Sequence, residues 1–268
     1  MSYFICPVCG GALVKNGSAY VCENRHSFDI SKYGYVNLLM SQQSSLKRHG
    51  DDKLMVLARR QFLEKGFYKP LCDKLCDCVK SLVPDGGVVA DVGCGEGYYT
   101  QAVSLCGDYN ICGIDISKDA LRYAPKAVGK GEFAVASAFQ LPFAENSVDC
   151  VLNVFAPSPY SEFSRVLKDD GVLVKAVPLE EHLWDLKRAL YNEPYKNKPE
   201  KRDDELFRLV ESHELNYKII LTDSQDIGNL FKMTPYYYKT GRDDAERLLS
   251  LNELETTVHF CVEIYKKR

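Results

Sequence analysis

The sequence predicts an α/β protein with a mostly parallel sheet and a small metal-binding module at its N-terminal end. Three observations support this fold class. Apolar runs and helical runs alternate between residues 88 and 177, which is typical of a parallel sheet with helices on both faces. The first of these apolar runs leads directly into a turn with three glycines. Cysteine and histidine residues also occur in two closely spaced pairs within the first 26 positions.

The composition is that of an ordinary soluble protein. The chain has 268 residues, of which 46% are hydrophobic and 26% charged, enough for one large domain and one small one. No stretch approaches the ~20 apolar residues of a membrane span, and the first residues lack the pattern of a signal peptide. We therefore expect a cytoplasmic protein without membrane contact, whose 11 cysteines serve as thiols or metal ligands rather than disulfides.

The first 34 residues are predicted to form a zinc-binding module. Cys6-Pro-Val-Cys9 and Cys22-Glu-Asn-Arg-His26 give a C-x2-C, x12, C-x3-H pattern, in which each pair directs two ligands at one ion. So short a segment does not build a hydrophobic core alone. Four protein ligands also leave no open coordination position, so the pattern predicts a structural zinc rather than a catalytic one.

Residues 35–50 are interpreted as a linker between this module and a domain formed by residues 51–268. Tyr33 and Tyr35 flank Gly34 at the start of the linker, and basic residues lie near its end. The tyrosines fit two roles. Their rings can stack on an unpaired RNA segment, or they can pack against the apolar side chains of the small module. The sequence leaves both open.

Two helices are expected before the first strand, over residues 51–65 and 70–82. The second contains Cys72, Cys76 and Cys78 among leucines. Cysteines one helical turn apart on an apolar face are more typical of buried side chains than of a metal site. Between the two helices, Tyr68 is close enough to the first strand for its ring to cover a bound ligand.

The turn after the first strand carries the strongest functional signal. Its acidic and glycine positions are Asp91, Gly93, Gly95, Glu96 and Gly97. The spacing lacks the two-residue gap before the third glycine that dinucleotide sites use. Asp115 ends the next strand about 20 residues later, where a carboxylate meets ribose hydroxyls. The pattern resembles the class I S-adenosylmethionine (SAM)-dependent methyltransferases, which have a Rossmann-like sheet; the alternative is a fold that kept the turn and lost the ligand.

The rest of the chain is expected to complete this sheet. Strands are predicted near 88–92, 111–116, 132–136, 149–155 and 171–177, helices near 97–106, 117–125 and 159–167, and two late strands at 216–222 and 256–265. The fourth strand ends in Asn153-Val-Phe155-Ala156-Pro157. This segment lacks the Asp/Asn-Pro-Pro-aromatic motif with which many methyltransferases hold an exocyclic amine, so it indicates a different target atom.

Motifs along nearly the whole chain resemble the bacterial 23S rRNA (guanine-N1)-methyltransferases. They are the zinc pattern, Gly34-Tyr35-Val-Asn37-Leu-Leu, Ala58-Arg59-Arg60-x-Phe62-Leu, Asp91 to Thr100, Phe155-Ala156-Pro157, His182-Leu-x-x-Leu-Lys187 and Met233-Thr234-Pro235. The resemblance implies SAM-dependent methylation of guanine N1 in a hairpin loop of 23S rRNA. It also implies a zinc module that helps to hold RNA and a homodimer that frames the RNA cleft.

The resemblance also assigns residues to roles. It places zinc on Cys6, Cys9, Cys22 and His26, and the cofactor on the turn from Asp91 to Gly97, on Tyr68 and on His182. Asp115 is added by the logic of the fold. Asn153, Phe155 and Pro157 are candidates for holding the target base.

Two other functions compete with this one. A methyltransferase for small molecules shares the sheet and the glycines but has no need of a zinc module. A non-catalytic, zinc-containing RNA-binding protein needs the module but not an intact cofactor turn. Both motifs are intact here, which favours an RNA-modifying enzyme.

The charge distribution points to the N-terminal end as the RNA-binding region. The net charge of the chain is −3, with +4 in residues 1–65, −5 in 66–180 and −2 in 181–268. Phosphate contacts are expected from Lys47, Arg48, Arg59 and Arg60. The alternatives are a helix that pairs its arginines with acidic neighbours, and an RNA path over the basic residues between 196 and 202.

Overall fold

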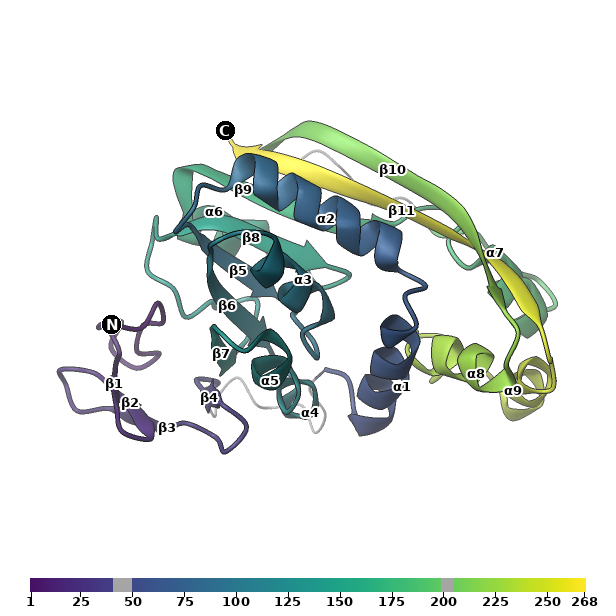
Figure 1. Cartoon of the computed structure of the whole chain (residues 1–268), viewed down its shortest axis with the longest axis horizontal. Helices are drawn as coiled ribbons and strands as arrows, with labels where there is room; N and C mark the ends of the chain where they lie inside the picture. Colours follow the sequence, from purple (N-terminus) through teal and green to yellow (C-terminus); the bar gives the residue numbers. More distant parts are fainter. Residues whose placement is uncertain (41–49, 199–204) are drawn as a thin grey trace.

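A single eight-stranded sheet forms the centre of the molecule (Figure 1). The computed structural model describes residues 1–40, 50–198 and 205–268, so Lys47, Arg48 and residues 199–202 of the alternative RNA path lie outside the described residues. The strand order is β10-β11-β9-β8-β5-β6-β7-β4. The six strands from β9 to β4 are parallel, while β11 is antiparallel to both β9 and β10. The predicted α/β class is confirmed.

The parallel strands lie close to where the apolar runs predicted them. Their bounds are β5 (Val88–Val92), β6 (Asn110–Asp115), β7 (Glu132–Val135), β8 (Val148–Val154) and β9 (Leu167–Pro178). Every residue of β5 is buried. Val89 faces one hydrophobic core and Ala90 faces a second, because successive side chains point to opposite faces of the sheet. A strand buried on both faces is why this segment reads as a continuous apolar run.

Helices follow the strands as expected, with one interruption. Their bounds are α1 (Lys53–Glu64), α2 (Lys69–Leu82), α3 (Tyr98–Cys106), α4 (Lys118–Leu121), α5 (Ala124–Val128) and α6 (Tyr160–Val166). The single helix predicted over 117–125 is wrong, because Pro125 lies in the first turn of a separate helix. Proline lacks an N–H to continue a preceding helix but suits the start of a new one.

The C-terminal third extends the sheet with two long strands. Its elements are α7 (Trp184–Leu190), β10 (Phe207–Leu221), α8 (Ser224–Lys232), α9 (Arg242–Leu249) and β11 (Leu254–Lys267). β10 is about twice as long as predicted. Polar side chains such as Glu211, Glu214 and Lys218 interrupt its apolar pattern, because the strand lies at the edge of the sheet with much of its length exposed.

The N-terminal module is a three-stranded sheet that docks onto the main one. It consists of β1 (Val14–Asn16), β2 (Ala19–Val21) and β3 (Ser27–Asp29). The next segment, β4 (Tyr35–Asn37), pairs in parallel with β7 and is the edge strand of the main sheet. The linker predicted over 35–50 therefore begins with a structural strand. Three residues are too short a run to be recognised from periodicity.

Specific contacts hold the module in place. The Ile5 N–H donates to the carbonyl of Pro142 at 2.9 Å, and the Phe4 and Phe143 rings lie 5.5 Å apart. The Glu132 carboxylate accepts from the Ser2 hydroxyl at 2.6 Å and from the Tyr3 N–H at 3.0 Å. The module thus contributes to the second hydrophobic core instead of forming one alone. In the described part of the chain, no helix is both long and apolar enough to cross a membrane.

Candidate cofactor and metal sites

The four predicted zinc ligands meet in the N-terminal module. The His26 Nδ1 atom lies 3.3 Å from Cys22 Sγ and 3.5 Å from Cys6 Sγ, and Cys9 Sγ lies 3.7 Å from Cys22 Sγ. All four ligand atoms lie within 4.8 Å of one another. The Cys6–Cys9 turn is closed by the Gly10 N–H, which donates to the Cys6 carbonyl at 2.8 Å.

These distances fit a tetrahedral zinc ion. Zn–S bonds of ~2.3 Å and Zn–N bonds of ~2.0–2.1 Å give ligand–ligand separations of about 3.5–3.8 Å. Cys6 and Cys22 are buried, and both belong to the core that the module shares with the sheet. A zinc ion bound here would therefore order the loops that dock on Pro142 and Phe143.

The glycine turn lies at the carboxyl edge of β5. Gly93, Gly95 and Gly97 have φ angles of +87°, +57° and +95°, in the region that favours glycine. A Cβ on Gly93 would lie 2.4 Å from the Cβ of Ala156, so this glycine lets the two loops approach. A Cβ on Gly95, in contrast, would meet no atom within 4 Å among the described residues. Gly95 thus faces open space at the edge where parallel sheets bind ligands.

Asp115 braces this turn from the end of β6. One carboxylate oxygen accepts from the Gly95 N–H at 2.8 Å, and the other accepts from the Ser117 N–H at 2.7 Å. Burial raises the pKa of Asp115, an effect that the two N–H donors partly offset. Each oxygen keeps a lone pair for a further donor, such as a ribose hydroxyl.

Asp91 lies beneath the turn with one oxygen unsatisfied. It is 2% exposed, and its Oδ2 accepts from the Thr100 hydroxyl at 2.6 Å. Its Oδ1 has no hydrogen-bond partner in the described structure. Burial raises the pKa of this carboxyl to about 7. A buried acceptor of this kind fits a ligand that carries an N–H or ammonium donor.

Tyr68 and Tyr99 add two more buried polar atoms without partners. Tyr68 precedes α2 and Tyr99 lies in α3, and neither hydroxyl meets a hydrogen-bonding group among the described residues. Burial raises the pKa of both phenols well above the ordinary value, so both are neutral donors. The glycine turn, Asp115, Asp91 and the tyrosines together fit a polar nucleoside cofactor such as SAM.

Four aromatic rings from distant parts of the chain gather beside this turn. Phe260 of β11 lies 4.4 Å from His182, 4.8 Å from Phe155 and 5.0 Å from Tyr68, measured between ring centroids. The structure thus brings together the predicted residues Tyr68, Phe155 and His182. Sequence reasoning missed Tyr99 and Phe260. The position of Tyr99, two residues after Gly97, is a sequence signal that it lies near the glycine turn. Phe260 has no such signal, because only the pairing of β11 with β9 brings it to this edge of the sheet.

His182 is a neutral ring at physiological pH. Burial is the main cause that lowers its pKa, to about 3. Its Nδ1 accepts from the His259 N–H at 3.4 Å, which assigns the ring proton to Nε2. Such an imidazole can donate a hydrogen bond, but it is too weak a base to take a proton from a ligand.

Asn153 braces the loop after β8 in this structure, and its role in holding a base stays a prediction. It is 0% exposed, and its amide donates to the carbonyls of Val92 at 3.1 Å and Pro157 at 3.2 Å. The Ser158 hydroxyl donates to its Oδ1 at 2.9 Å. Both N–H groups are used inside the protein, so Asn153 ties the loop after β8 to the end of β5.

Besides Pro157, Phe155 is the base-holding candidate that is exposed to solvent. It is 44% exposed and has a φ of +55°, which is uncommon for a bulky residue. The strained backbone presents its ring at the carboxyl edge, next to Ala156, which packs on Gly93. Pro157 contributes its carbonyl to Asn153, and any contact of its ring with a base stays a prediction.

Glu96 and the α1 arginines form an electrostatic group beside the turn. Burial raises the pKa of Glu96, and the charges of Arg60 and Arg59 partly offset this. Arg59 also pairs with Asp51 and donates to the Met233 carbonyl at 3.1 Å. Arg59 thus pairs with an acidic neighbour, as the alternative interpretation of the α1 arginines expected. Contact of Glu96 with the cofactor stays a prediction.

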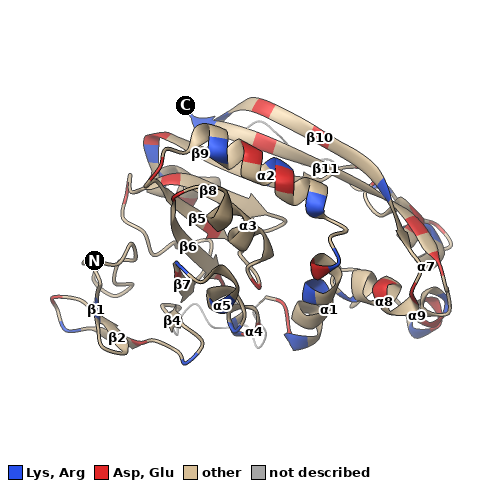
Figure 2. Cartoon of the chain, viewed as in Figure 1, with Lys and Arg blue, Asp and Glu red and all other residues tan. Residues whose placement is uncertain are grey.

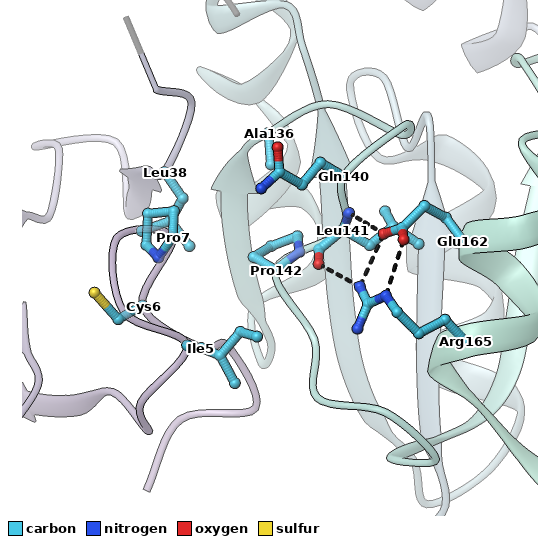
Figure 3. A pocket seen from close by; sticks show the side chains of 11 residues that line it. Ile5, Cys6, Pro7, Leu38, Ala136, Gln140, Leu141, Pro142, Glu162 and Arg165 are labelled. Atoms are coloured by element: carbon cyan, nitrogen blue, oxygen red, sulfur yellow. Dashed lines mark hydrogen bonds and ion pairs between the residues drawn. The ribbon is translucent and has the colours of Figure 1, made fainter. Parts of the chain in front are cut away.

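A pocket of about 330 Å³ lies where the module meets the sheet (Figure 3). Arg165 of α6 lines it and pairs with Glu162 at 2.8 Å. The guanidinium also donates to the carbonyls of Phe143 and Leu141 at 2.8 and 2.9 Å. Because these charges are satisfied internally, the pair braces the segment that receives Ile5 rather than presenting a free charge to a ligand.

The chain matches known proteins along its whole length. The family model "RlmA, N-terminal" matches residues 4–47, and "Methyltransferase domain" matches residues 90–175. The chain is 35% identical to the "Putative 23S rRNA (guanine-N(1)-)-methyltransferase YxjB" of Bacillus subtilis, covering 99% of this chain and 98% of that protein. It is 30% identical to the "23S rRNA (guanine(748)-N(1))-methyltransferase" of Streptomyces fradiae, covering 97% and 96%.

The substitution Cys22→Ala is expected to remove one zinc ion per chain and to disorder residues 1–30, because three ligands remain and a core position is lost. Metal analysis and NMR of the purified protein measure both effects, and SAM affinity should stay within about twofold. The matched control is Cys78→Ala, a buried thiol on α2 outside the cluster. Ordered module signals without stoichiometric zinc would contradict this prediction.

The substitution Asp91→Asn is expected to stabilise the cofactor-free protein at high pH while weakening SAM binding. The folded-state pKa of about 7 exceeds the ordinary 3.8, so the stability that this carboxyl contributes is full below about pH 4 and is lost as the pH rises through about 7. Ionisation at pH 8 then costs up to ~4 kcal/mol.

Urea denaturation of both proteins between pH 5 and pH 8 tests this prediction. The stability difference in favour of the variant should grow with pH. A variant less stable than the wild type at pH 8 would show that a partner compensates the buried charge.

Proposed function

This chain belongs to the 23S rRNA (guanine-N1)-methyltransferase family, and from that premise we propose that it methylates N1 of a guanine in a hairpin loop of 23S rRNA. The observation that carries the proposal is the position of Phe155. An exposed aromatic ring lies on a strained loop that packs directly on the glycine turn. A base stacked on this ring would lie beside the cofactor.

The reaction needs a guanine taken out of its stack. Its Watson–Crick edge is available only where the base is unpaired, which favours a loop over a duplex. SAM supplies the electrophilic methyl group. The rings of Phe155 and Phe260 offer a stacking surface, and Asn153 holds the loop that carries Phe155 against β5.

Positioning is proposed as the main source of rate. Holding a nucleophile in line at near-attack distance supplies ~7–11 kcal/mol of the barrier. The N1 proton has to leave as the methyl bond forms, and the neutral His182 is excluded as its acceptor by its low pKa. Residues Tyr68, Asp91, Gly95 and Asp115 are proposed to bind and orient the cofactor.

The proposed function also gives the zinc module a role, which is to help hold the RNA substrate. The module shares a core with the sheet and continues into β4, so it is held rigidly relative to the cofactor edge. A rigid module suits a substrate larger than the catalytic edge itself. Assembly as a homodimer and a location in the cytoplasm are further parts of the proposal, supported by the resemblance to the family.

Methyl transfer to 23S rRNA tests the function directly. Purified protein is given labelled SAM with unmodified 23S rRNA, with assembled large subunits or with no RNA. We expect label in one of the RNA samples and a new reverse-transcription stop at a loop guanine, because a methyl on N1 blocks Watson–Crick pairing. SAM binding without label in either RNA would favour a small-molecule methyltransferase.

Variants at Phe155 locate the base in the same assay. Phe155→Ala should lower methylation at limiting RNA by ~5- to 150-fold, the equivalent of the ~1–3 kcal/mol of a base–aromatic stack, whereas Phe155→Tyr should retain it. SAM affinity should be nearly unchanged in both. Equal activity of the alanine variant would place the target base elsewhere.

A further inference from the structure

Four basic side chains recur every four residues beside the cofactor edge. They are Lys118, Arg122, Lys126 and Lys130, which lie in α4, in α5 and just after each helix. All four are exposed, and Asp119 is the single acidic residue between positions 116 and 131. This stretch therefore carries a net charge of +3, although residues 66–180 together carry −5. Figure 2 shows the blue segments of α4 and α5 on the same side of the view as those of α1.

The turn that leaves the zinc module packs on this basic stretch. Its ends are joined by the Ser31 N–H, which donates to the Tyr35 carbonyl at 2.7 Å. Gly34 has a φ of +94°, and a Cβ there would lie 3.1 Å from the Cβ of Pro125 in α5. A close approach of this kind holds the turn in a fixed place.

Two cations lie over the ring of Tyr33 at this turn, one from the turn itself and one from the end of α4. The ring is 39% exposed, with the Lys32 ammonium 5.2 Å and the Arg122 guanidinium 5.7 Å from its centroid. Cation–π contacts restrain these flexible side chains while their charges stay in solvent. Arg122 also pairs with Asp119 at 3.2 Å, which neutralises part of its charge.

The other end of the stretch reaches the cofactor edge. Ser117 caps α4 and lies two positions after Asp115, the last residue of β6. On the opposite flank, a Cβ on Gly97 would lie 3.0 Å from Ala124 of α5. The basic residues thus extend between the cofactor turn and the turn that leaves the zinc module.

We propose that Lys118, Arg122, Lys126 and Lys130, with Lys32 and Tyr33, form the surface that binds the phosphate backbone of the RNA. The inference rests on the proposed function, and it moves the electrostatic contact from the α1 arginines to α4 and α5. Exposed cations ordered around an aromatic ring are the combination that tracks an unpaired strand. An acidic protein surface would also pair with these cations. Such a partner would not explain why the basic residues extend as far as the cofactor edge.

A charge-matched pair of variants tests the surface. The first carries Lys118→Gln, Arg122→Gln and Lys126→Gln. The control carries Lys69→Gln, Lys74→Gln and Lys80→Gln on α2, which lies at the opposite side of the view in Figure 2 and loses the same net charge. Binding of a 23S rRNA hairpin fragment to each full-length protein is followed by fluorescence anisotropy from 50 to 300 mM salt.

The slope of the logarithm of the binding constant against the logarithm of the salt concentration distinguishes the outcomes. Each phosphate contact to a single strand contributes about −0.7 to the slope, so the first variant should lose about 2 from its magnitude and the control nothing. An unchanged slope in the first variant, or an equal change in the control, would overturn the proposal. Calorimetry of SAM binding should give both variants wild-type affinity.

Tyr33 gives a second, independent measurement. Tyr33→Leu should weaken RNA binding by about threefold at fixed salt, because the two cations lose their common restraint, and Tyr33→Phe should not. Equal affinities for all three proteins would contradict the role assigned to the ring. If the three substitutions on α4 and α5 flatten the salt slope but the wild type transfers no methyl, the proposed function fails and the surface stands. If the wild type methylates while the substitutions leave the slope unchanged, the surface fails.

Discussion

The hydrogen bond from the Gly95 N–H to the Asp115 carboxylate is the contact on which the cofactor edge depends. Three glycines in left-handed conformations allow the backbone to turn sharply after β5, and a charge-assisted bond of ~1.5–3 kcal/mol fixes that turn against β6. Asn153 then ties the loop after β8 to the same edge. These two braces position Phe155, and the pairing of β11 with β9 places the Phe260 ring beside it. The site is therefore built from loops that hydrogen bonds hold against neighbouring strands.

The zinc module is integrated into this architecture. Cys6 and Cys22 are core residues as well as predicted zinc ligands, so binding of the metal would support packing on the sheet. β4 continues the module into the sheet, and the turn just before β4 contacts α5 through Gly34 and Pro125. A module fixed at two places can align RNA with the cofactor edge, whereas a module on a free linker would have to be ordered at each binding event.

The sequence predicted those parts of the structure that local spacing encodes. The Cys/His pattern and the glycine turn are short patterns with a direct chemical meaning. The structure brings the four Cys/His side chains together and places the three glycines in left-handed conformations. Features that arise from tertiary contacts were not predictable. Asn153 braces a loop because Val92 and Pro157 meet in the fold, Phe260 reaches the site through strand pairing, and the basic residues of α4 and α5 lie within a segment of net negative charge.

We propose that the cofactor binds in the open space beside Gly95. Gly95→Ala tests it, because the added methyl group meets no described atom of the protein, and Gly86→Ala is a matched control with a φ of +77° and equal free space at the opposite edge of the sheet. Both variants should fold with a similar loss of about 1 kcal/mol in stability. In calorimetric titration with SAM, we expect at least about tenfold weaker binding for Gly95→Ala alone. Unchanged SAM affinity in Gly95→Ala would contradict it.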